Sequence, residues 1–427
     1  MDTYQNTTQP AGEPHEQHAP HNDSYDPHEL VVMGPEFKAD AHRRYARLRA
    51  KGPIHRAQFF PGITGWLVVD YDLAREALTH PALLKDPEPA AEMLEAAGFL
   101  GHKRGTGFGG QMLEADPPEH TRLRRLVSGV FSRKRSAAME PRITEIANEL
   151  IDAMPPSGEL DLVQAFTAPL PVTVIAELLG IPEADRQDFR RWTALAFQVG
   201  HPEYATAVAS LHGFLRQLVE DKRRAPGDDL MSALVAARDK DDGRLSEEEL
   251  AGTAALLVIA GHETTVNLLG NSVLALLRHP DQLRLLRNDL RLLPDAIEEF
   301  LRYDTSVERT TNRYAAEDLE LGGAHIPRGG IVTVALASAN RVAPLPGGGD
   351  PDALDIARPV ARHLSFGHGI HHCLGAPLAR LEARVALHTL LTRVPHLELA
   401  VPAESLDWFP AGMVRGVLSL PVRYRLG

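Results

Sequence analysis

Apolar residues along most of the chain recur at spacings of three and four, the period of helices that bury one face. Four leucines follow this spacing in residues 281–293, DQLRLLRNDLRLL, and residues 374–387, LGAPLARLEARVAL, show the same pattern. We expect one amphipathic helix in each segment. Strand-like runs are short and scattered: GWLVVDY from Gly65, GGIVTVAL from Gly329, and SLPVRYRL near the C-terminus. The pattern predicts a mainly α protein with small β-sheets.

One apolar segment, residues 251–277, is long enough to cross a membrane. It carries His262, Glu263 and two threonines near its centre, so we expect a buried helix. Residues 1–29 are rich in polar residues and proline, without the pattern of a signal peptide, and predict a disordered tail. No repeat divides the remainder, which favours a single domain over residues 30–427.

The charge balance and the cysteine count narrow the class of protein. The chain has 45 basic and 57 acidic residues, a formal charge of −12, which disfavours general binding to nucleic acid or to an anionic membrane. Its single cysteine excludes an intramolecular disulfide, which fits a protein of the reducing cytoplasm.

That cysteine, Cys373, ends an unusual loop, LSFGHGIHHCLG, over residues 364–375. Gly367, Gly369 and Gly375 permit a tight loop, and the following helix would present its positive end to the sulfur. Such a place favours the thiolate. A thiolate there can be a nucleophile, a zinc ligand or a haem ligand, although no second Cys/His pair supports zinc. A buried structural cysteine is the alternative without chemistry.

The stretch FGHGIHHCLG, Phe366 to Gly375, resembles the haem-binding signature of the cytochrome P450 superfamily at every fixed position. The resemblance implies that the cofactor is haem b (iron protoporphyrin IX) and that Cys373 is the axial ligand of its iron. It also implies that His371 contacts a haem propionate and that Phe366 and Gly375 lie beside the ligand. The implied fold places the haem between the long central helix and the cysteine loop with its following helix.

The segment AGHETT, residues 260–265, resembles the oxygen-activation segment of the same family. Glycine and a threonine whose hydroxyl bonds the carbonyl of Ala260 would loosen the helix and open a groove. Glu263 is an acid in an apolar helix, which is costly unless it is used or paired. The resemblance implies that Glu263 and Thr264 are catalytic and deliver protons.

Two further sets of residues match the family. Glu299 and Arg302, with Arg358, resemble a structural ion-pair lock of the haem-side core. His120, Arg124 and Arg313 match propionate contacts, for which arginine supplies charge-assisted donors.

The resemblance, which is strongest to actinobacterial members that modify natural products, implies a soluble, cytoplasmic, monomeric monooxygenase. It would use O2 and electrons from a ferredoxin and ferredoxin reductase to hydroxylate or epoxidise an apolar small molecule, such as a polyketide or macrolide. Its expected pocket walls include residues 94–110. The other expected pocket residues are Leu257, Ala260, Gly261, Val307, Met413 and Val414.

Residues 120–135 carry six Lys or Arg and no acid. We expect Arg125, Arg133, Lys134 or Arg135 to dock an acidic electron donor, although a solvated basic stretch would look the same. Oxidative coupling without oxygen insertion, a haem-binding sensor and a haem-free thiol hydrolase remain alternative functions.

Overall fold

The computed structural model describes residues 34–60, 62–96, 111–129, 131, 133–196, 202–239, 245–409 and 412–427. The predicted tail, residues 1–29, and most of the expected pocket wall 94–110 lie outside these ranges. The α-helices are α1 (Pro35–Ala39), α2 (Ala41–Lys51), α3 (Tyr71–Thr79), α4 (Ala91–Ala96), α5 (Glu119–Ser128), α6 (Arg133–Ala138), α7 (Glu140–Asp152), α8 (Pro169–Leu178), α9 (Arg186–Ala196), α10 (Tyr204–Arg224), α11 (Leu230–Asp239), α12 (Glu247–Arg278), α13 (Pro280–Asn288), α14 (Leu293–Tyr303), α15 (Leu336–Ala339) and α16 (Ala376–Arg393). The strands are β1 (Ile54–Phe60), β2 (Ile63–Val68), β3 (Leu83–Leu84), β4 (Ser157–Asp161), β5 (Arg313–Ala315), β6 (Leu319–Leu321), β7 (Ala324–Ile326), β8 (Ile331–Val334), β9 (His396–Leu399) and β10 (Pro421–Arg425).

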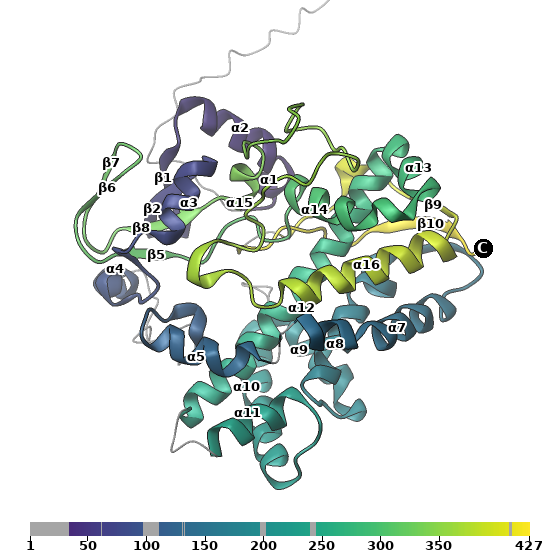
Figure 1. Cartoon of the computed structure of the whole chain (residues 1–427), viewed down its shortest axis with the longest axis horizontal. Coiled ribbons are helices and arrows are strands. Elements are labelled where there is room, and N and C mark those ends of the chain that lie inside the picture. Colours follow the sequence, from purple (N-terminus) through teal and green to yellow (C-terminus); the bar gives the residue numbers. More distant parts are fainter. Residues whose placement is uncertain are drawn as a thin grey trace, which may run out of the picture.

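Helices dominate the molecule, as the hydrophobic pattern predicts (Figure 1). The helix α12 runs through the middle, and α16 passes close to it. The largest sheet has the strand order β1-β2-β8-β5-β3, and it lies at the opposite side of the molecule from β9 and β10.

The helix α12 confirms the expectation of a long buried helix. Its N-terminus is a capping box, in which Ser246 accepts from the backbone of Glu249 and the Glu249 carboxylate accepts from the backbone of Ser246. At 1.5 Å per residue its 32 residues span about 48 Å, so it reaches across the molecule. Among the described residues, no helix is long and apolar enough to cross a membrane.

The sheet builds on the two predicted strands, each shorter than its apolar run. The strand β2 pairs in parallel with β8, with Trp66 opposite Val332. Gly65 is needed there, because a Cβ at this position would lie 2.4 Å from the carbonyl oxygen of Ile331. The run GWLVVDY does not continue as a strand, since Asp70 caps α3 by accepting from the amide of Leu73 at 3.0 Å.

The predicted single helix over residues 281–293 is wrong. The helix α13 ends at Asn288, and Asp289 adopts φ −145° and ψ 88°. The Asp289 side chain accepts from the amide of Arg291 at 3.0 Å and starts a 3-10 turn that leads into α14. A local side-chain bond to the backbone thus overrides the leucine spacing. The second predicted helix is present as α16, which continues beyond the expected end at residue 387.

Two hydrophobic clusters meet along α12. Its N-terminal half, up to Val258, packs with α8, α10 and α11. Its C-terminal half, from Val266, packs with α7, α14 and α16. The residues between these two points, which include AGHETT, belong to the fully buried core of neither cluster. The fold therefore places the polar segment of α12 at a junction between two apolar cores.

Candidate active site

The cysteine loop is a tight turn that leads into α16. The amide of Cys373 donates to the carbonyl oxygen of Phe366 at 2.8 Å and closes the loop. Gly367 and Gly369 have φ values of 76° and 73°, a conformation that glycine adopts without strain. A Cβ at Gly369 would also lie 2.8 Å from a methyl group of Thr79. The glycine spacing therefore reflects backbone geometry.

The electrostatics at Cys373 differ from the expectation of a preformed thiolate. The residue is accessible to solvent. Even so, the protein packed around the sulfur raises the pKa of the Cys373 thiol above its ordinary value by desolvation. The amides of Gly375 and Ala376 and the guanidinium of Arg124 lower that pKa only in part. Desolvation therefore exceeds the effect of the helix N-terminus on the pKa of this thiol.

Four predicted propionate contacts lie close together beside this loop. The rings of His120 and His371 are 4.3 Å apart between centroids. Arg124 donates to the carbonyl oxygen of His372 at 2.6 Å. Arg313 is buried, and it influences the charge of His371, as do His120 and Arg124.

A lysine that the sequence did not single out joins this group. Lys85 is 4% exposed and donates to the carbonyl oxygen of Asn312 at 2.6 Å. Burial first, and then the neighbouring Arg313, lower the pKa of Lys85 to about 7. Burial first, and then Lys85, lower the pKa of His371 to about 2.

These side chains fit the two carboxylates of haem. Within the described ranges, no carboxylate forms an ion pair with Lys85, His120, Arg124, Arg313 or His371. The buried atoms Nε2 of His120, Nε2 of His371 and Nε of Arg313 lack hydrogen-bond partners there. Buried donors without partners are costly, and a dicarboxylate placed among them would satisfy them.

The polar segment of α12 has an accessible spot in an otherwise buried helix. Ala260 is exposed, and Gly261 and Thr264 are half-buried, whereas Val258 and Val266 are buried. The Thr264 hydroxyl donates to the carbonyl oxygen of Ala260 at 2.9 Å, as the sequence predicted. This turn of α12 is therefore open to solvent on one side.

Glu263 points away from solvent and is held by a residue one turn later. The side-chain Nδ2 of Asn267 donates to Oε1 of Glu263 at 3.1 Å and to the Glu263 backbone carbonyl oxygen at 2.9 Å. Burial raises the pKa of Glu263 to about 7, and the Asn267 bond opposes this shift. His262 Nδ1 is 2.7 Å from the carbonyl oxygen of Val258, and its Nε2 lies 4.0 Å from Glu263 Oε2. The Asn267 contact has a visible signal in the sequence, namely the i, i+4 spacing.

The expected pocket residues fall into two groups. Val307 and Val414 face each other in an isolated antiparallel bridge, and the neighbouring Met413 is 42% exposed. Leu257 is 7% exposed and lies with Gly261 on α12. Among the described residues, no hydrogen bond or ion pair joins one group to the other.

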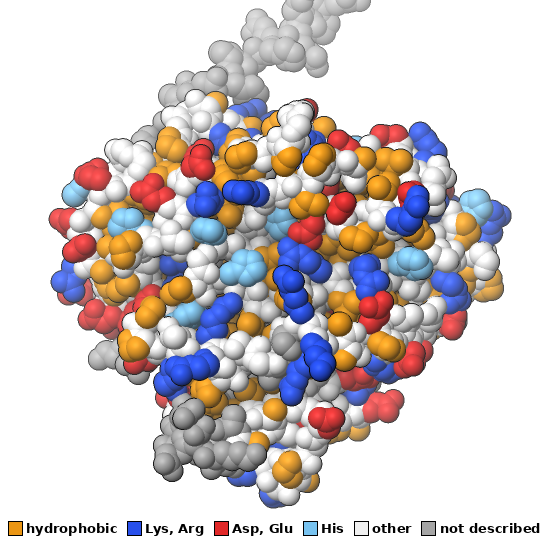
Figure 2. Space-filling view, in the orientation of Figure 1, with side chains coloured by type: hydrophobic (Ala, Val, Ile, Leu, Met, Phe, Trp, Pro, Cys, Tyr) orange, Lys and Arg blue, Asp and Glu red, His pale blue; other side chains and the backbone are white. Residues whose placement is uncertain are grey.

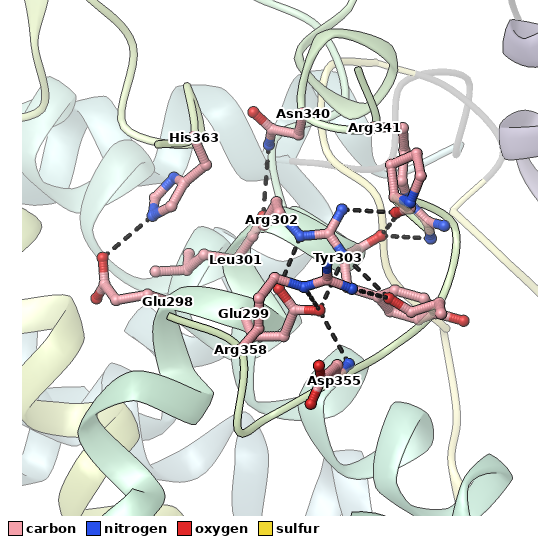
Figure 3. A network of polar contacts seen from close by, with 12 residues as sticks. Glu298, Glu299, Leu301, Arg302, Tyr303, Asn340, Arg341, Asp355, Arg358 and His363 are labelled. Carbon is pink, nitrogen blue, oxygen red and sulfur yellow. Dashed lines mark hydrogen bonds and ion pairs between the residues drawn. The ribbon is translucent and has the colours of Figure 1, made fainter. Parts of the chain in front are cut away.

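Figure 3 shows Glu299, Arg302 and Arg358, the residues that resemble the structural ion-pair lock of the family. Arg302 donates two hydrogen bonds to the carboxylate of Glu299, at 2.7 and 2.8 Å, and both side chains are almost fully buried. Arg358 Nε lies 3.5 Å from Glu299 Oε1. Arg302 also donates to the carbonyl oxygens of Pro351 and Ala353, so this lock holds the loop that precedes the cysteine segment.

Lys and Arg side chains gather across the middle of the face that carries α5 and α16 (Figure 2). From the expected donor-docking set, Arg125, Arg133, Lys134 and Arg135 are all exposed. We call these four residues the basic surface.

Comparison with known proteins places these features in a family. The family model described as "Cytochrome P450" matches residues 172–404. Cytochrome P450 monooxygenase PikC of Streptomyces venezuelae is 48% identical over 404 residues, covering 93% of this chain and 94% of the relative. The 6-deoxyerythronolide B hydroxylase of Saccharopolyspora erythraea is 44% identical over 397 residues, covering 91% and 96%. The solved structure of the tirandamycin C-bound P450 monooxygenase TamI matches with a TM-score of 0.85 and 43% identity, covering 92% of this chain and 99% of that one.

Proposed function

This chain belongs to the cytochrome P450 family and is a monooxygenase with a haem cofactor, and from that premise we propose its substrate class, its electron donor and the roles of its residues. The substrate is a macrolide or another polyketide. The support is that relatives with more than 40% identity over most of the chain include a hydroxylase of 6-deoxyerythronolide B and a monooxygenase that binds tirandamycin C.

The cofactor in this proposal is haem b, with Cys373 as the axial ligand of its iron. Haem bound through a thiolate supplies O2 activation and the oxidation of the substrate. His120, Arg124, Arg313 and His371 hold the propionates. The support is that two arginines and two neutral histidines lie together beside the cysteine loop, and that buried nitrogen atoms of His120, His371 and Arg313 lack hydrogen-bond partners.

Glu263 and Thr264 handle protons in this proposal. With a pKa of about 7, the Glu263 carboxyl can both give and regain a proton at neutral pH. The Thr264 hydroxyl is held by the carbonyl of Ala260 beside the accessible spot on α12, where it can pass a proton onward. Glu263 is buried, so in this proposal it takes up a proton that comes from outside and relays it inward past Thr264.

The pocket walls in this proposal are Leu257, Ala260, Gly261, Val307, Met413 and Val414. All six are small or apolar, which suits a large apolar substrate. Because apolar contacts discriminate weakly, substrate selection depends on the shape of these walls.

Electrons come from the small redox partners on which this family depends, here a ferredoxin reduced by a ferredoxin reductase. Within the basic surface, Arg125 follows Arg124 on α5, and Arg124 donates to the carbonyl oxygen of His372 in the cysteine loop. The other three residues lie on α6, which packs against α16. An acidic donor would be steered to such a surface. We further propose a monomer of one domain over residues 30–427 that works in the cytoplasm, where the single cysteine stays reduced.

The test of the haem-thiolate assignment is the spectrum of the reduced protein with carbon monoxide. We expect the long-wavelength band of thiolate ligation in the wild type and its loss in Cys373→Ser. A haem-free wild type, or an unchanged band in Cys373→Ser, would contradict the assignment.

The substrate class needs a separate test. We expect members of a panel of macrolactones and linear polyketides to shift the haem spectrum and to yield hydroxylated or epoxidised products with a ferredoxin system. A panel that leaves the spectrum unchanged, while fatty acids or terpenes shift it, would overturn the substrate class and leave the haem assignment intact.

A further inference from the structure

A buried lysine ties the N-terminal helix α1 to the turn that carries Met413 and Val414. The side chain of Lys38 is 0% exposed. Its Nζ donates to the carbonyl oxygen of Val414 at 2.9 Å and to that of Gly412 at 3.1 Å. Lysine is almost never fully buried unless it is paired, so these contacts are specific features of this chain.

The charge partner of Lys38 lies in the other segment of the expected pocket wall. Lys38 Nζ is 3.2 Å from Oε2 of Glu308, which is also 0% exposed. Glu308 Oε1 accepts from the hydroxyl of Tyr45 in α2 at 2.8 Å. Burial lowers the pKa of Lys38 to about 8, and Glu308 opposes this shift, so the ammonium is mostly protonated at neutral pH. Burial acts against the charge of Glu308 too, but Lys38, Arg309 and Arg415 outweigh it and lower its pKa.

The backbone joins the two wall segments, 306–309 and 412–415. Val307 and Val414 form the antiparallel bridge, and the amide of Glu308 donates to the carbonyl oxygen of Met413 at 2.8 Å. The amide of Arg415 donates to the carbonyl oxygen of Ser306 at 2.8 Å. These bonds join the two segments along their main chains, while the side chain of Met413 remains 42% exposed.

Arg415 closes the arrangement from the other side. Its guanidinium donates to the carbonyl oxygen of Lys38 and, at 2.6 Å, to Oδ1 of Asp304. His42 of α2 lies 3.1 Å from the same oxygen of Asp304. The helix α1 therefore contacts both wall segments through Lys38, and α2 contacts segment 306–309 through the hydroxyl of Tyr45.

We propose that Lys38 is a positioning residue that sets the spacing of segments 306–309 and 412–415, and so the shape of the substrate pocket that Val307, Met413 and Val414 line. The inference rests on the proposed function, because it takes these three residues as pocket walls. Without the ammonium, two carbonyl oxygens and a buried carboxylate lose their donor. The turn then moves or admits water to satisfy them.

The test compares two azoles that bind haem iron directly in the full-length holoprotein. Imidazole is small and probes the iron, whereas clotrimazole is bulky and also contacts the pocket walls. In Lys38→Met, which keeps the length of the side chain, we expect clotrimazole to bind roughly tenfold more weakly and imidazole to bind about as in the wild type. We also expect faster hydrogen exchange in residues 412–418 and 306–309.

Three further variants separate positioning from general destabilisation. Lys38→Arg keeps the charge and the donors and should restore most of the clotrimazole affinity. The double variant Lys38→Met, Glu308→Gln also lacks the buried carboxylate that Lys38→Met leaves unpaired. It should be more stable than Lys38→Met but should not regain clotrimazole affinity. Arg43→Met, which removes an exposed cation paired to Asp40 at 3.4 Å on α2, is the matched control and should change neither affinity nor exchange.

Several outcomes would overturn the proposal. An unchanged clotrimazole-to-imidazole affinity ratio in Lys38→Met would do so, as would full recovery of the ratio in the double variant. A wild type that binds clotrimazole no more tightly than imidazole would also do so, because the walls would then add nothing to binding. A protein without haem would instead refute the proposed function. The carbon monoxide spectrum detects haem independently of azole binding.

Discussion

Replacing Glu299 by glutamine should destabilise the protein far more than the same change at the adjacent Glu298. The Glu299 carboxylate accepts two hydrogen bonds from Arg302 and a third, at 3.0 Å, from the amide of Asp355. The side chain of Arg302 is 0% exposed. Glutamine keeps the shape but removes the charge, so it leaves the Arg302 guanidinium buried without a counter-ion.

The contacts set the expected magnitude. Removing one partner of a buried ion pair lowers the free energy of unfolding by about 3–5 kcal/mol. The whole free energy of unfolding of a protein is typically about 5–15 kcal/mol. Glu298 pairs with Arg380, whose side chain is 39% exposed, and with His363. A partly exposed pair of this kind contributes about 1 kcal/mol. Glu299→Gln should therefore lose at least about 2 kcal/mol more than Glu298→Gln.

The destabilisation should extend to the haem site, because hydrogen bonds connect α14 to the cysteine segment. The hydroxyl of Ser365, one residue before Phe366, donates to the carbonyl oxygen of Leu301 at 2.6 Å, and Asn340 donates to Ser365 Oγ at 2.8 Å (Figure 3 shows Leu301 and Asn340). We therefore expect Glu299→Gln to purify with reduced haem content.

The assay is urea unfolding of both variants and the wild type, followed in parallel by haem absorbance and tryptophan fluorescence at fixed haem and protein concentration. If the two variants unfold within about 1 kcal/mol of each other, the buried pair does not carry the stability assigned to it.

Three further predictions concern coupling in catalysis, the pH dependence of stability, and electron transfer. Thr264→Ala should keep haem content but divert reducing equivalents into hydrogen peroxide. The measurement is the product formed per reduced nicotinamide consumed. If this ratio equals that of the wild type, the Thr264 hydroxyl serves only as a helix bond to Ala260. Because the folded pKa of Glu263 is raised to about 7, native protein holds a proton there that the unfolded chain releases above about pH 4.5. The stability of wild type relative to Glu263→Gln should therefore fall by up to about 3 kcal/mol as pH rises from about 4.5 to 7, and a pH-independent difference in urea unfolding would contradict the raised pKa. Charge reversal of Arg133 and Lys134 should slow reduction of the haem by an acidic ferredoxin, and the effect should be greatest at low salt. Unchanged stopped-flow reduction rates across ionic strengths would show that the basic surface does not dock the donor.

Several features of this protein follow from short stretches of sequence. The glycines of the cysteine loop specify left-handed backbone at Gly367 and Gly369, and the Thr264 hydroxyl bond to Ala260 follows from i, i+4 spacing. The same spacing predicts α16, and the length and composition of residues 251–277 predict a buried helix. Each of these depends on interactions within one or two turns, so the residue pattern is sufficient to predict it.

Other features depend on what distant segments bring together. No sequence pattern singled out Lys38 or Lys85, yet packing buries both beside charged groups from other parts of the chain. The thiol of Cys373 is another case, because the helix N-terminus predicts a lowered pKa while the surrounding protein raises it. Local pattern determined α12, α16, the cysteine loop and the residues capable of chemistry, although it missed the end of α13 at Asn288. Only the tertiary structure decided which charges lose water and which partners they meet, because desolvation depends on every segment packed around a group and not on its neighbours in sequence.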